Sequence, residues 1–407
     1  MSAFADDSRL RKNLLFIHEI DWTRKVVYEV HDIPELLSLR GYEVAVLDFP
    51  EVSGRHWRKL VRPNQSRAWL GSKIRLVSPP MPSVSMFGRW LVAAIAIPFI
   101  LRLVLQLRPN VIVTYAVPTY GWQAVTVGRL LRIPVVYRAI DAPTELRPGL
   151  HRPLTALAER YVCRFSTHVS THNVVLRNRC VGYGASPQHT SLLIPGVDQS
   201  RFYHGPRNAA LAEELGIHED DVVILFMGTL FNFAQLDEFT KQLAPHLRAN
   251  QALKFLIVGD GEAAPLIRAV VQKEELQDSV IMVGMIDFEK LPDFLRLGSL
   301  GILPFTPSAV SHNALPNKVL QYLSCGLPSI AIKLDGLKSV IPEFCGLEYV
   351  ANLHELSDQA VAIARDPARL TKLRDDAIRY SQLHLDWDSQ ILRFEQLLKD
   401  VVCEFKL

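Results

Sequence analysis

Two short stretches of this 407-residue sequence hold polar residues in positions where they could do chemistry. Residues 315–329 read as a helix that begins after Pro316 and ends at Gly326, and it carries Lys318 and Gln321 three residues apart. Residues at this spacing share one face of a helix. Free backbone N–H groups and the helix dipole favour an anion at a helix N-terminus, so this face suits a diphosphate. Because proline and glycine are also common helix punctuation, the alternative is a helix without a ligand.

The second stretch is centred on Asp141, which follows an apolar run at residues 135–137. A carboxylate at a strand end can accept the proton of an attacking hydroxyl group. Asp141 is near Arg138 and Arg147 in the sequence, which predicts a single acid among arginines. The alternative is that Asp141 caps the helix or turn that begins at Pro143.

The elements around these residues predict two α/β domains. Short apolar runs alternate with helical stretches in both halves, which is typical of parallel sheets covered by helices. The length of 407 residues also exceeds what one hydrophobic core usually supports. The predicted strands lie at 13–17, 44–47, 111–114, 135–137 and 168–171 in the first half, and at 222–226, 255–258, 280–283, 300–303 and 329–332 in the second.

The domain boundary is expected in the turn-rich residues 195–206. Residues 1–200 are predicted to form the first doubly wound domain and residues 201–380 the second. Residues 381–407 are predicted to form a C-terminal helix that crosses back to the first domain. Because ligands bind beyond the carboxyl ends of the strands in such sheets, we expect two domains that face a central cleft.

Composition limits the classes of protein that fit. Hydrophobic residues make up 49% and charged residues 21% of the chain, which excludes a disordered protein. The five cysteines are scattered and contain no C-x-x-C pair, so neither a disulfide framework nor a zinc site is predicted. The first residues do not have the pattern of a signal peptide. We therefore expect a cytoplasmic protein.

Charge is distributed unevenly along the chain. The net charge is only +3, but residues 52–140 contain thirteen lysines or arginines and no acidic residue. Such a region attracts anionic lipid or nucleic acid. No recognised nucleic-acid-binding module accompanies the charge, so we expect an anionic membrane surface as the partner of the first domain and no nucleic acid.

An apolar segment at residues 90–107 lies within this basic region. Its longest uninterrupted apolar run, residues 90–101, is too short to span a bilayer, because a spanning helix needs about 20 residues. The segment reads either as a core helix or as a monotopic helix in the headgroup region. Basic residues and tryptophans favour the second interpretation, and they are Arg89, Arg102, Arg108, Trp57, Trp69 and Trp90.

The helix at 315–329 also resembles a signature of GT-B glycosyltransferases of the GT4 type, in which a helix that ends in a Gly-x-Pro turn holds the donor nucleotide. The segments at 226–230, 255–262, 283–286 and 303–305 resemble donor-facing loops of that family, in the expected order. The resemblance implies the GT-B fold with two Rossmann-like domains, a nucleotide-sugar donor, no metal and no further cofactor. The donor-binding residues that it implies are Gly228, Thr229, Leu230, Glu262, Met285, Phe305, Asn317, Lys318 and Gln321.

Two positions depart from the GT4 pattern. Retaining members of that family carry two glutamates where this chain has Asn313 and Gln321. The arrangement of Lys318, Gln321 and Tyr322 is more similar to the inverting β-glucuronosyltransferase of xanthan assembly and its GT70 family. In that enzyme the catalytic base follows a Val-Tyr-Arg strand end at the spacing that Asp141 has here. The loop at 18–25 resembles the first loop of the same enzyme, which implies acceptor-side roles for His18, Asp21 and Trp22.

Together these resemblances imply a glycosyltransferase at the inner face of the plasma membrane. The expected donor is a UDP-sugar, with UDP-glucuronate as a candidate, and the expected acceptor is a lipid-linked saccharide of polysaccharide or cell-envelope synthesis. Transfer is expected to invert the anomeric configuration, with Asp141 as the base. The alternatives are a retaining GT4-type hexosyl- or mannosyltransferase and a non-catalytic GT-B scaffold.

Overall fold

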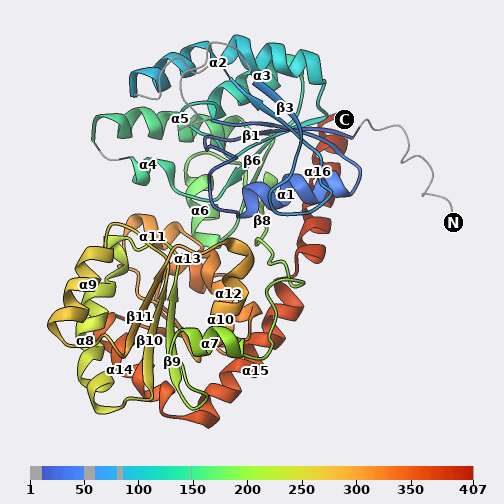
Figure 1. The fold of residues 1–407 in the computed structure, drawn as a ribbon. Helices are drawn as coiled ribbons and strands as arrows, with labels where there is room; N and C mark the ends of the chain where they lie inside the picture. The colour runs from blue at the N-terminus through green and yellow to red at the C-terminus, as the bar shows by residue number, and fades with distance from the viewer. Residues whose placement is uncertain (1–11, 50–59, 80–85, 148, 407) are drawn as a thin grey trace. The chain divides into compact units, whose positions relative to one another are not determined.

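The computed structural model describes residues 12–49, 60–79, 86–147 and 149–406. The chain divides into two units, which are drawn in Figure 1. Unit 1 comprises Met1–Ile194 and Ile391–Leu407, and unit 2 comprises Pro195–Gln390. The division falls at the start of the turn-rich stretch, slightly before the predicted boundary at residue 200.

The sheet of unit 1 contains eight strands within the described residues. They are β1 (Asn13–Ile17), β2 (Glu43–Leu47), β3 (Leu60–Gln65), β4 (Ile74–Ser78), β5 (Val111–Thr114), β6 (Val135–Ala139), β7 (His168–Thr171) and β8 (Thr190–Leu192). In space they follow the order β3-β4-β2-β1-β5-β6-β7-β8, and the neighbours are parallel except for β3 and β4. The order reverses between β1 and β5, which is where doubly wound sheets bind ligands.

Helices pack against this sheet and bury its apolar side chains. They are α1 (Glu29–Leu39), α2 (Met86–Leu107), α3 (Gly121–Leu131), α4 (Pro143–Leu146), α5 (Arg152–Phe165), α6 (Val174–Gly182) and α16 (Trp387–Lys406). Figure 1 shows α2, α3 and α5 near one another, and the contacts of α3 with α2 and with α5 place the three in one layer.

Helix α2 contains the apolar segment at 90–107. Val92, Ala96 and Ile100 recur every four residues and are buried in the core of unit 1, as expected for the inner face of a helix. On the other face Ile95 is 39% and Leu105 is 57% exposed. One face of the segment is therefore core, while the other offers apolar side chains to the surroundings.

The residues expected to flank a membrane-lying helix are only partly described. Trp57 lies outside the described residues, as do the side chains of Arg89 and Trp90. Trp69 donates its Nε1–H to Asp32 at 3.0 Å. Among the described residues, no helix combines the length and the apolar character needed to cross a bilayer.

The sheet of unit 2 is entirely parallel. Its six strands within the described residues are β9 (Val222–Met227), β10 (Leu253–Val258), β11 (Val280–Gly284), β12 (Leu300–Leu303), β13 (Ser329–Ile332) and β14 (Leu347–Val350). The order is β11-β10-β9-β12-β13-β14, so it reverses between β9 and β12. This is the strand order of a Rossmann domain. The predicted α/β class with two doubly wound domains is confirmed by the two sheets.

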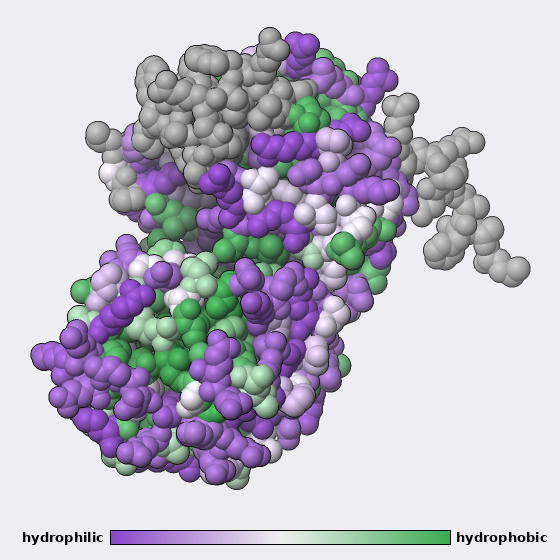
Figure 2. All heavy atoms as spheres, viewed as in Figure 1, coloured by the Kyte–Doolittle hydropathy of each residue, from purple (hydrophilic) through white to green (hydrophobic). Residues whose placement is uncertain are grey.

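Helices of unit 2 follow nearly every strand. They are α7 (Ala209–Glu214), α8 (Leu236–Ala249), α9 (Ala264–Lys273), α10 (Leu291–Leu297), α11 (Ala309–Asn313), α12 (Asn317–Ser324), α13 (Asp335–Lys338), α14 (Leu353–Ala364) and α15 (Pro367–His384). In the view of Figure 2, the apolar surface of unit 2 gathers over its strands, and the flanking helices present mostly polar side chains.

The C-terminal helix was predicted to begin at residue 381, but it begins at Trp387. Two helices, α15 and α16, meet at a break around Asp386. The break is held by the N–H of Val197, which donates to the carbonyl of Leu385 at 2.6 Å. Helix α16 begins in unit 2, and from Ile391 onward it belongs to unit 1, where Glu395 accepts bonds from Arg40 and Tyr42 at 2.6 and 3.0 Å.

Candidate active site

Three glycines mark the carboxyl ends of the first three strands of unit 2. Gly228, Gly259 and Gly284 have φ values of +127°, +137° and +72°. The N–H of Gly228 donates to the carbonyl of Val258 at 2.8 Å, and the N–H of Gly259 donates to the carbonyl of Gly284 at 2.9 Å. A Cβ atom on Gly259 would lie 2.1 Å from the carbonyl oxygen of Gly228. Only glycine allows this approach, so the edge of the sheet is bare backbone that a ligand can reach.

Lys318 lies in the first turn of α12 and points toward the Gly228 loop. Its Nζ is 4.1 Å from the ring centroid of Phe226 and 4.7 Å from that of Phe305, which are favourable cation–π contacts. A Cβ atom on Gly228 would lie 2.7 Å from this Nζ. Burial alone lowers the pKa of Lys318 to about 7, and no charged neighbour contributes to the shift. An anion that reaches this lysine would restore its charge, so the environment favours a ligand with phosphate oxygens.

Helix α12 is held firmly in the position that aims Lys318. The helix spans Asn317–Ser324, which confirms the predicted start and end. The N–H of Met227 donates to the hydroxyl oxygen of Tyr322, a fully buried residue, at 2.7 Å. Gly326 ends the helix with φ +68°, and a Cβ there would lie 2.7 Å from the Nδ1 of His204. The helix start is thus fixed against β9 rather than being a free end.

The other predicted donor residues lie on loops at the same end of the sheet, with different exposure. Thr229 and Glu262 are exposed, and the Oε1 of Glu262 accepts the N–H of Asn232 at 3.0 Å, which ties two of these loops together. Met285 is 68% exposed. The side chain of Leu230 is fully buried, so only its backbone could face a ligand.

An aromatic cluster at this edge was not predicted. The ring of Phe233 lies 5.0 Å from the ring of Phe305 and 5.0 Å from the ring of Phe231. The planes of Phe231 and Phe233 are nearly parallel, with an angle of 15° between them. Phe231 and Phe233 are 41% and 44% exposed. Exposed rings of this kind suit the face of a nucleobase or sugar. The signal in the sequence was the Phe-x-Phe pattern directly after the loop of Gly228.

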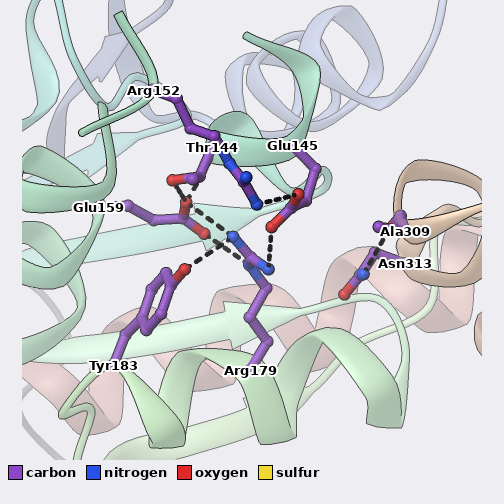
Figure 3. Close-up of polar contacts among 8 residues, drawn as sticks. All are labelled: Thr144, Glu145, Arg152, Glu159, Arg179, Tyr183, Ala309 and Asn313. Atoms are coloured by element: carbon purple, nitrogen blue, oxygen red, sulfur yellow. Dashed lines mark hydrogen bonds and ion pairs between the residues drawn. The ribbon is translucent and has the colours of Figure 1, made fainter. Parts of the chain in front are cut away.

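The two positions where retaining GT4 members carry glutamate hold amides. Asn313 ends α11, and its Nδ2 donates to the carbonyl of Ala309 at 2.7 Å, as Figure 3 shows. Gln321 is half-buried on α12, as is Asn317 at the start of that helix. Neither amide can supply a carboxylate to the reaction.

In unit 1, Asp141 lies in the loop after β6, directly before α4. Its side chain is exposed. The residue at the N-cap of α4 is Ala142, and no side-chain hydrogen bond caps this helix, so the capping alternative for Asp141 is wrong. The pKa of Asp141 is raised, first by partial loss of water and then by the charge of Glu29, while Lys25 opposes the shift. These are properties of a proton acceptor.

The expected arginine surroundings of Asp141 are wrong. Arg138 is fully buried and forms two bonds of 2.8 Å to the carboxylate of Glu29, with a third bond to the hydroxyl of Ser170 at 3.0 Å. Arg147 is paired with Glu19 at 3.2 Å. Both arginines thus neutralise other acids, which the sequence does not reveal because those acids lie more than one hundred residues away.

The predicted acceptor-side residues are mostly buried. His18 and Trp22 are 0% and 1% exposed, and Asp21 is 5% exposed. Burial and then the charge of His31 lower the pKa of His18 to about 3, so it is neutral at ordinary pH. In this conformation His18 and Trp22 form the framework of the first loop, and any contact with an acceptor must come from other atoms of that loop.

A network of charged residues fixes the segment that follows Asp141, as seen in Figure 3. Arg179 of α6 bonds to Glu159 of α5 at 2.9 and 3.2 Å and to Glu145 of α4 at 3.2 Å. Glu145 also accepts a bond from Arg152 at 3.0 Å, and Glu159 accepts the N–H of Thr144 at 3.1 Å. This network anchors α4 to α5 and α6, so the loop of Asp141 is firmly held at its C-terminal side.

Within the described residues, no group of three or more His, Cys, Asp or Glu side chains could hold a metal ion.

Comparisons with known proteins point to one family. Residues 221–366 match the family described as Glycosyl transferases group 1. A D-inositol 3-phosphate glycosyltransferase 2 of Catenulispora acidiphila is 26% identical over 211 residues, which is 49% of this chain and 48% of that protein. The alpha-D-kanosaminyltransferase of Streptomyces kanamyceticus is 22% identical over 225 residues, 53% of this chain and 57% of that protein. The chain thus spans about half the length of these relatives.

Solved structures resemble the whole chain. The sucrose-phosphate synthase of Thermosynechococcus elongatus superposes with a TM-score of 0.74 at 17% identity, covering 96% of this chain and 100% of that one. HepE of Anabaena, solved in complex with UDP, has a TM-score of 0.72 at 13% identity, covering 95% and 100%. The chain therefore has the GT-B fold with two Rossmann-like domains, and the family match to the group 1 glycosyl transferases lies within its unit 2.

Proposed function

We propose that this protein is a glycosyltransferase that takes a sugar from a UDP-sugar and transfers it, with inversion, to a lipid-linked saccharide. The observation that carries the proposal is Lys318, a lysine with a pKa of about 7 at a helix start beside bare glycine loops. The match of residues 221–366 to the group 1 glycosyl transferases supports a sugar donor. UDP as the nucleotide is supported by HepE, which was solved with UDP.

The chemistry assigned to unit 2 is departure of the diphosphate. When the bond between the anomeric carbon and the diphosphate oxygen breaks, negative charge develops on the leaving group. The ammonium of Lys318 and the free N–H groups at the start of α12 can stabilise that charge. Phe231 and Phe233 provide aromatic faces for the nucleoside or sugar. No metal ion is required in this scheme.

The chemistry assigned to unit 1 is activation of the acceptor. Asp141 accepts the proton of the acceptor hydroxyl while that oxygen attacks the anomeric carbon from the side opposite the diphosphate. Its exposure and its raised pKa support this role. Similarity of the Asp141 segment to the inverting GT70 family supports inversion, and a glucuronosyl donor is proposed on the same ground.

A membrane-bound acceptor is proposed from the surface of unit 1. The acid-free residues 52–140 favour an anionic bilayer surface, and Ile95 and Leu105 offer exposed apolar side chains on α2. The protein would then act peripherally at the cytoplasmic face of the plasma membrane, in synthesis of a polysaccharide or cell-envelope glycan.

A retaining GT4-type hexosyl- or mannosyltransferase is the second candidate. The specific observation in its favour is that the family match covers residues 221–366, which include Lys318. The match holds although Asn313 and Gln321 stand where retaining members carry glutamate. A non-catalytic GT-B scaffold would bind UDP without transferring a sugar.

A screen of nucleotide sugars by thermal shift, followed by NMR of the product, tests the proposal. A ligand present at about 100 times its Kd stabilises the folded protein by about 2.7 kcal/mol. We expect a UDP-sugar to raise Tm in the native protein and to do so far less in Lys318→Ala. Product with the anomeric configuration of the donor would replace inversion with the retaining alternative, and UDP binding without transfer would favour the scaffold.

A further inference from the structure

Unit 1 carries an open groove of about 540 Å³ between α3 and α5. Sites for small molecules typically have volumes of about 300–1,000 Å³, so the groove is large enough for one ligand. All of its lining residues belong to unit 1. The groove lies beside Arg147, a few residues beyond Asp141 in the chain.

The polar atoms of the aromatic wall are bonded within the protein. The Nε1–H of Trp122 donates to the carbonyl of Pro118 at 3.2 Å. The hydroxyl groups of Tyr161 and Thr126 are 3.0 Å apart, and Thr126 donates to the carbonyl of Trp122 at 2.7 Å. Ring faces and aliphatic atoms are what this wall offers to a ligand. A saccharide would need hydrogen-bond partners here, so the wall selects for an apolar group.

The other wall is apolar as well and is exposed. Leu154 and Leu157 of α5 line the groove and are 52% and 67% exposed. Ala158 lies one turn along α5 from Leu154 and lines the same groove. Neighbouring exposed apolar side chains of this kind mark a binding surface more often than isolated ones do.

One end of the groove holds the ion pair of Arg147 and Glu19. The carboxylate of Glu19 accepts the backbone N–H groups of Val117, Thr119 and Tyr120, and its second oxygen lies 3.2 Å from Nη2 of Arg147. This fixed carboxylate holds the guanidinium at the groove. The Arg147 side chain is still 34% exposed, and a guanidinium has five N–H donors, so it can also bind a phosphate.

Two sets of bonds hold the helices around the groove. The hydroxyl groups of Thr126 on α3 and Tyr161 on α5 are 3.0 Å apart, and the network in Figure 3 ties α5 to α4 and α6. Arg179 bridges Glu145 of α4 and Glu159 of α5, so α5 cannot move away from α4 without breaking these bonds. A site that is already ordered loses less conformational freedom when it binds a ligand.

We infer that this groove binds the apolar chain of the lipid-linked acceptor, with the phosphate of that lipid at Arg147. An apolar channel that ends at an arginine matches an apolar chain that carries a negative charge. The inference rests on the proposed function and gives its acceptor a defined site. A protein that only contacts the membrane surface would not need the groove. Monomeric farnesyl phosphate distinguishes a lipid bound in the groove from such contact.

The first experiment measures binding of farnesyl phosphate to the full chain, in parallel with farnesol and with inorganic phosphate. We expect farnesyl phosphate to bind and inorganic phosphate not to bind detectably. The double variant Leu154→Gln, Leu157→Gln should weaken binding of farnesyl phosphate about tenfold or more, because contact with two leucines is lost. The control Leu130→Gln changes a leucine that is 69% exposed on α3 and outside the groove, and its affinity should equal that of the native protein.

Arg147→Gln tests independently whether Arg147 binds the phosphate of the lipid. It should weaken binding of farnesyl phosphate and leave binding of farnesol unchanged. Equal affinities of the Leu154/Leu157 variant and the Leu130 control would overturn the inference, as would equal loss for farnesol and farnesyl phosphate in Arg147→Gln. Binding that appears only with vesicles of anionic phospholipid, and never with monomeric farnesyl phosphate, would also overturn it.

A second experiment compares a lipid-linked acceptor with the same saccharide on a water-soluble aglycone. The leucine variant should raise KM for the lipid-linked acceptor by about tenfold and leave KM for the soluble acceptor unchanged. Equal changes for both acceptors would argue against a lipid site. If the native protein transfers no sugar to either acceptor, the proposed function fails, whereas binding of farnesyl phosphate still decides whether the groove is a lipid site.

Discussion

The two units reverse their strand order in the same way, but the reversal of unit 1 holds an ion pair, whereas that of unit 2 holds a lysine with no acid beside it. Between β1 and β5 of unit 1, the carboxylate of Glu19 accepts three backbone N–H groups and pairs with Arg147. Between β9 and β12 of unit 2, the loops are glycine-rich, and Lys318 has aromatic rings but no acid beside it. A doubly wound sheet thus offers one anion site at each reversal, and in unit 1 a side chain of the protein occupies it.

This difference suggests separate tasks for the two units, namely diphosphate binding in unit 2 and proton transfer in unit 1. The lysine end of unit 2 is suited to hold a diphosphate, while unit 1 satisfies its own anion site and leaves Asp141 exposed as a potential base. The family match agrees with the division, because residues 221–366 lie in unit 2 and the match does not extend to unit 1. The family match therefore lies in the unit that carries Lys318, whereas the solved structures resemble both units.

The largest expected effect comes from Asp141→Asn. Loss of a general base typically lowers turnover by about 10²–10⁴-fold, and we expect a kcat loss in this range. The Kd for UDP, measured by calorimetry, should not change, because the diphosphate is assigned to unit 2. Glu43→Gln is a suitable control, since Glu43 is an exposed acid at the start of β2 in the same unit. Turnover that stays within twofold of the native protein would remove Asp141 as the base.

Replacement of Glu19 tests whether its carboxylate occupies an anion site. Glu19→Ala leaves three backbone donors and Arg147 without their partner, and we expect a loss of about 3 kcal/mol in the free energy of unfolding. Inorganic phosphate should restore part of this stability, because it can occupy the same N–H groups. Denaturant titrations with and without phosphate measure both effects.

The control for this prediction is Glu238→Ala in unit 2. Glu238 forms an exposed pair with Lys241 at 3.0 Å, and such pairs contribute about 0–1 kcal/mol. If phosphate stabilises Glu19→Ala no more than it stabilises Glu238→Ala, the loop of unit 1 is not an anion site.

How much of this could be predicted from the sequence differs between the units. In unit 2 the strands β9 to β13, the limits of α12 and the position of Lys318 depend on local patterns of apolar residues, glycine and proline, and these were predicted, whereas β14 was missed. In unit 1 the edge strand β3 was missed because it contains Pro63, which cannot donate to a ladder, and Asn64 with φ 54°. Strand β3 pairs with β4 in the antiparallel direction, and no helix lies between the two strands. The alternation of strands and helices that predicted the other strands is therefore absent here.

The charged pairs of unit 1 could not be predicted from local sequence at all. Arg138 and Glu29 are separated by 109 positions, and Arg147 and Glu19 by 128. Each pair forms only because the sheet brings distant loops together. Sequence reasoning therefore assigned both arginines to Asp141, which is near them along the chain, but in the fold they pair with Glu29 and Glu19.

Close backbone packing in unit 2 gives the next prediction. Gly259→Ala forces a Cβ toward the carbonyl oxygen of Gly228, so we expect a loss of about 2 kcal/mol in stability together with weaker UDP binding. Gly284 also has a positive φ, of +72°, but nothing lies within 4 Å of a Cβ added there, so Gly284→Ala should cost less. Urea titration and UDP calorimetry on both variants measure the difference. Equal effects at the two positions would mean that the contact between the loops does not matter for the nucleotide.

A pH dependence of UDP binding is also expected, and only Lys318 should produce it. Its pKa of about 7 in the free protein means that the lysine is largely neutral at pH 8 and above. A diphosphate favours the charged form and raises this pKa, so binding takes up a proton. Affinity should therefore fall as pH rises from 7 to 9, by up to about tenfold per unit.

The lysine must be separated from the nucleotide, which also titrates. A terminal phosphate has its last pKa near 6, so its charge is nearly constant from about pH 7 to 9. Lys318→Arg keeps a positive charge at every pH in this range, and its UDP affinity should be nearly independent of pH even if it is weaker. Calorimetry in two buffers with different ionisation enthalpies measures the proton uptake directly. The same slope in the native protein and in Lys318→Arg would assign the titration to another group, and the contrast between the two units would then lose its cationic side.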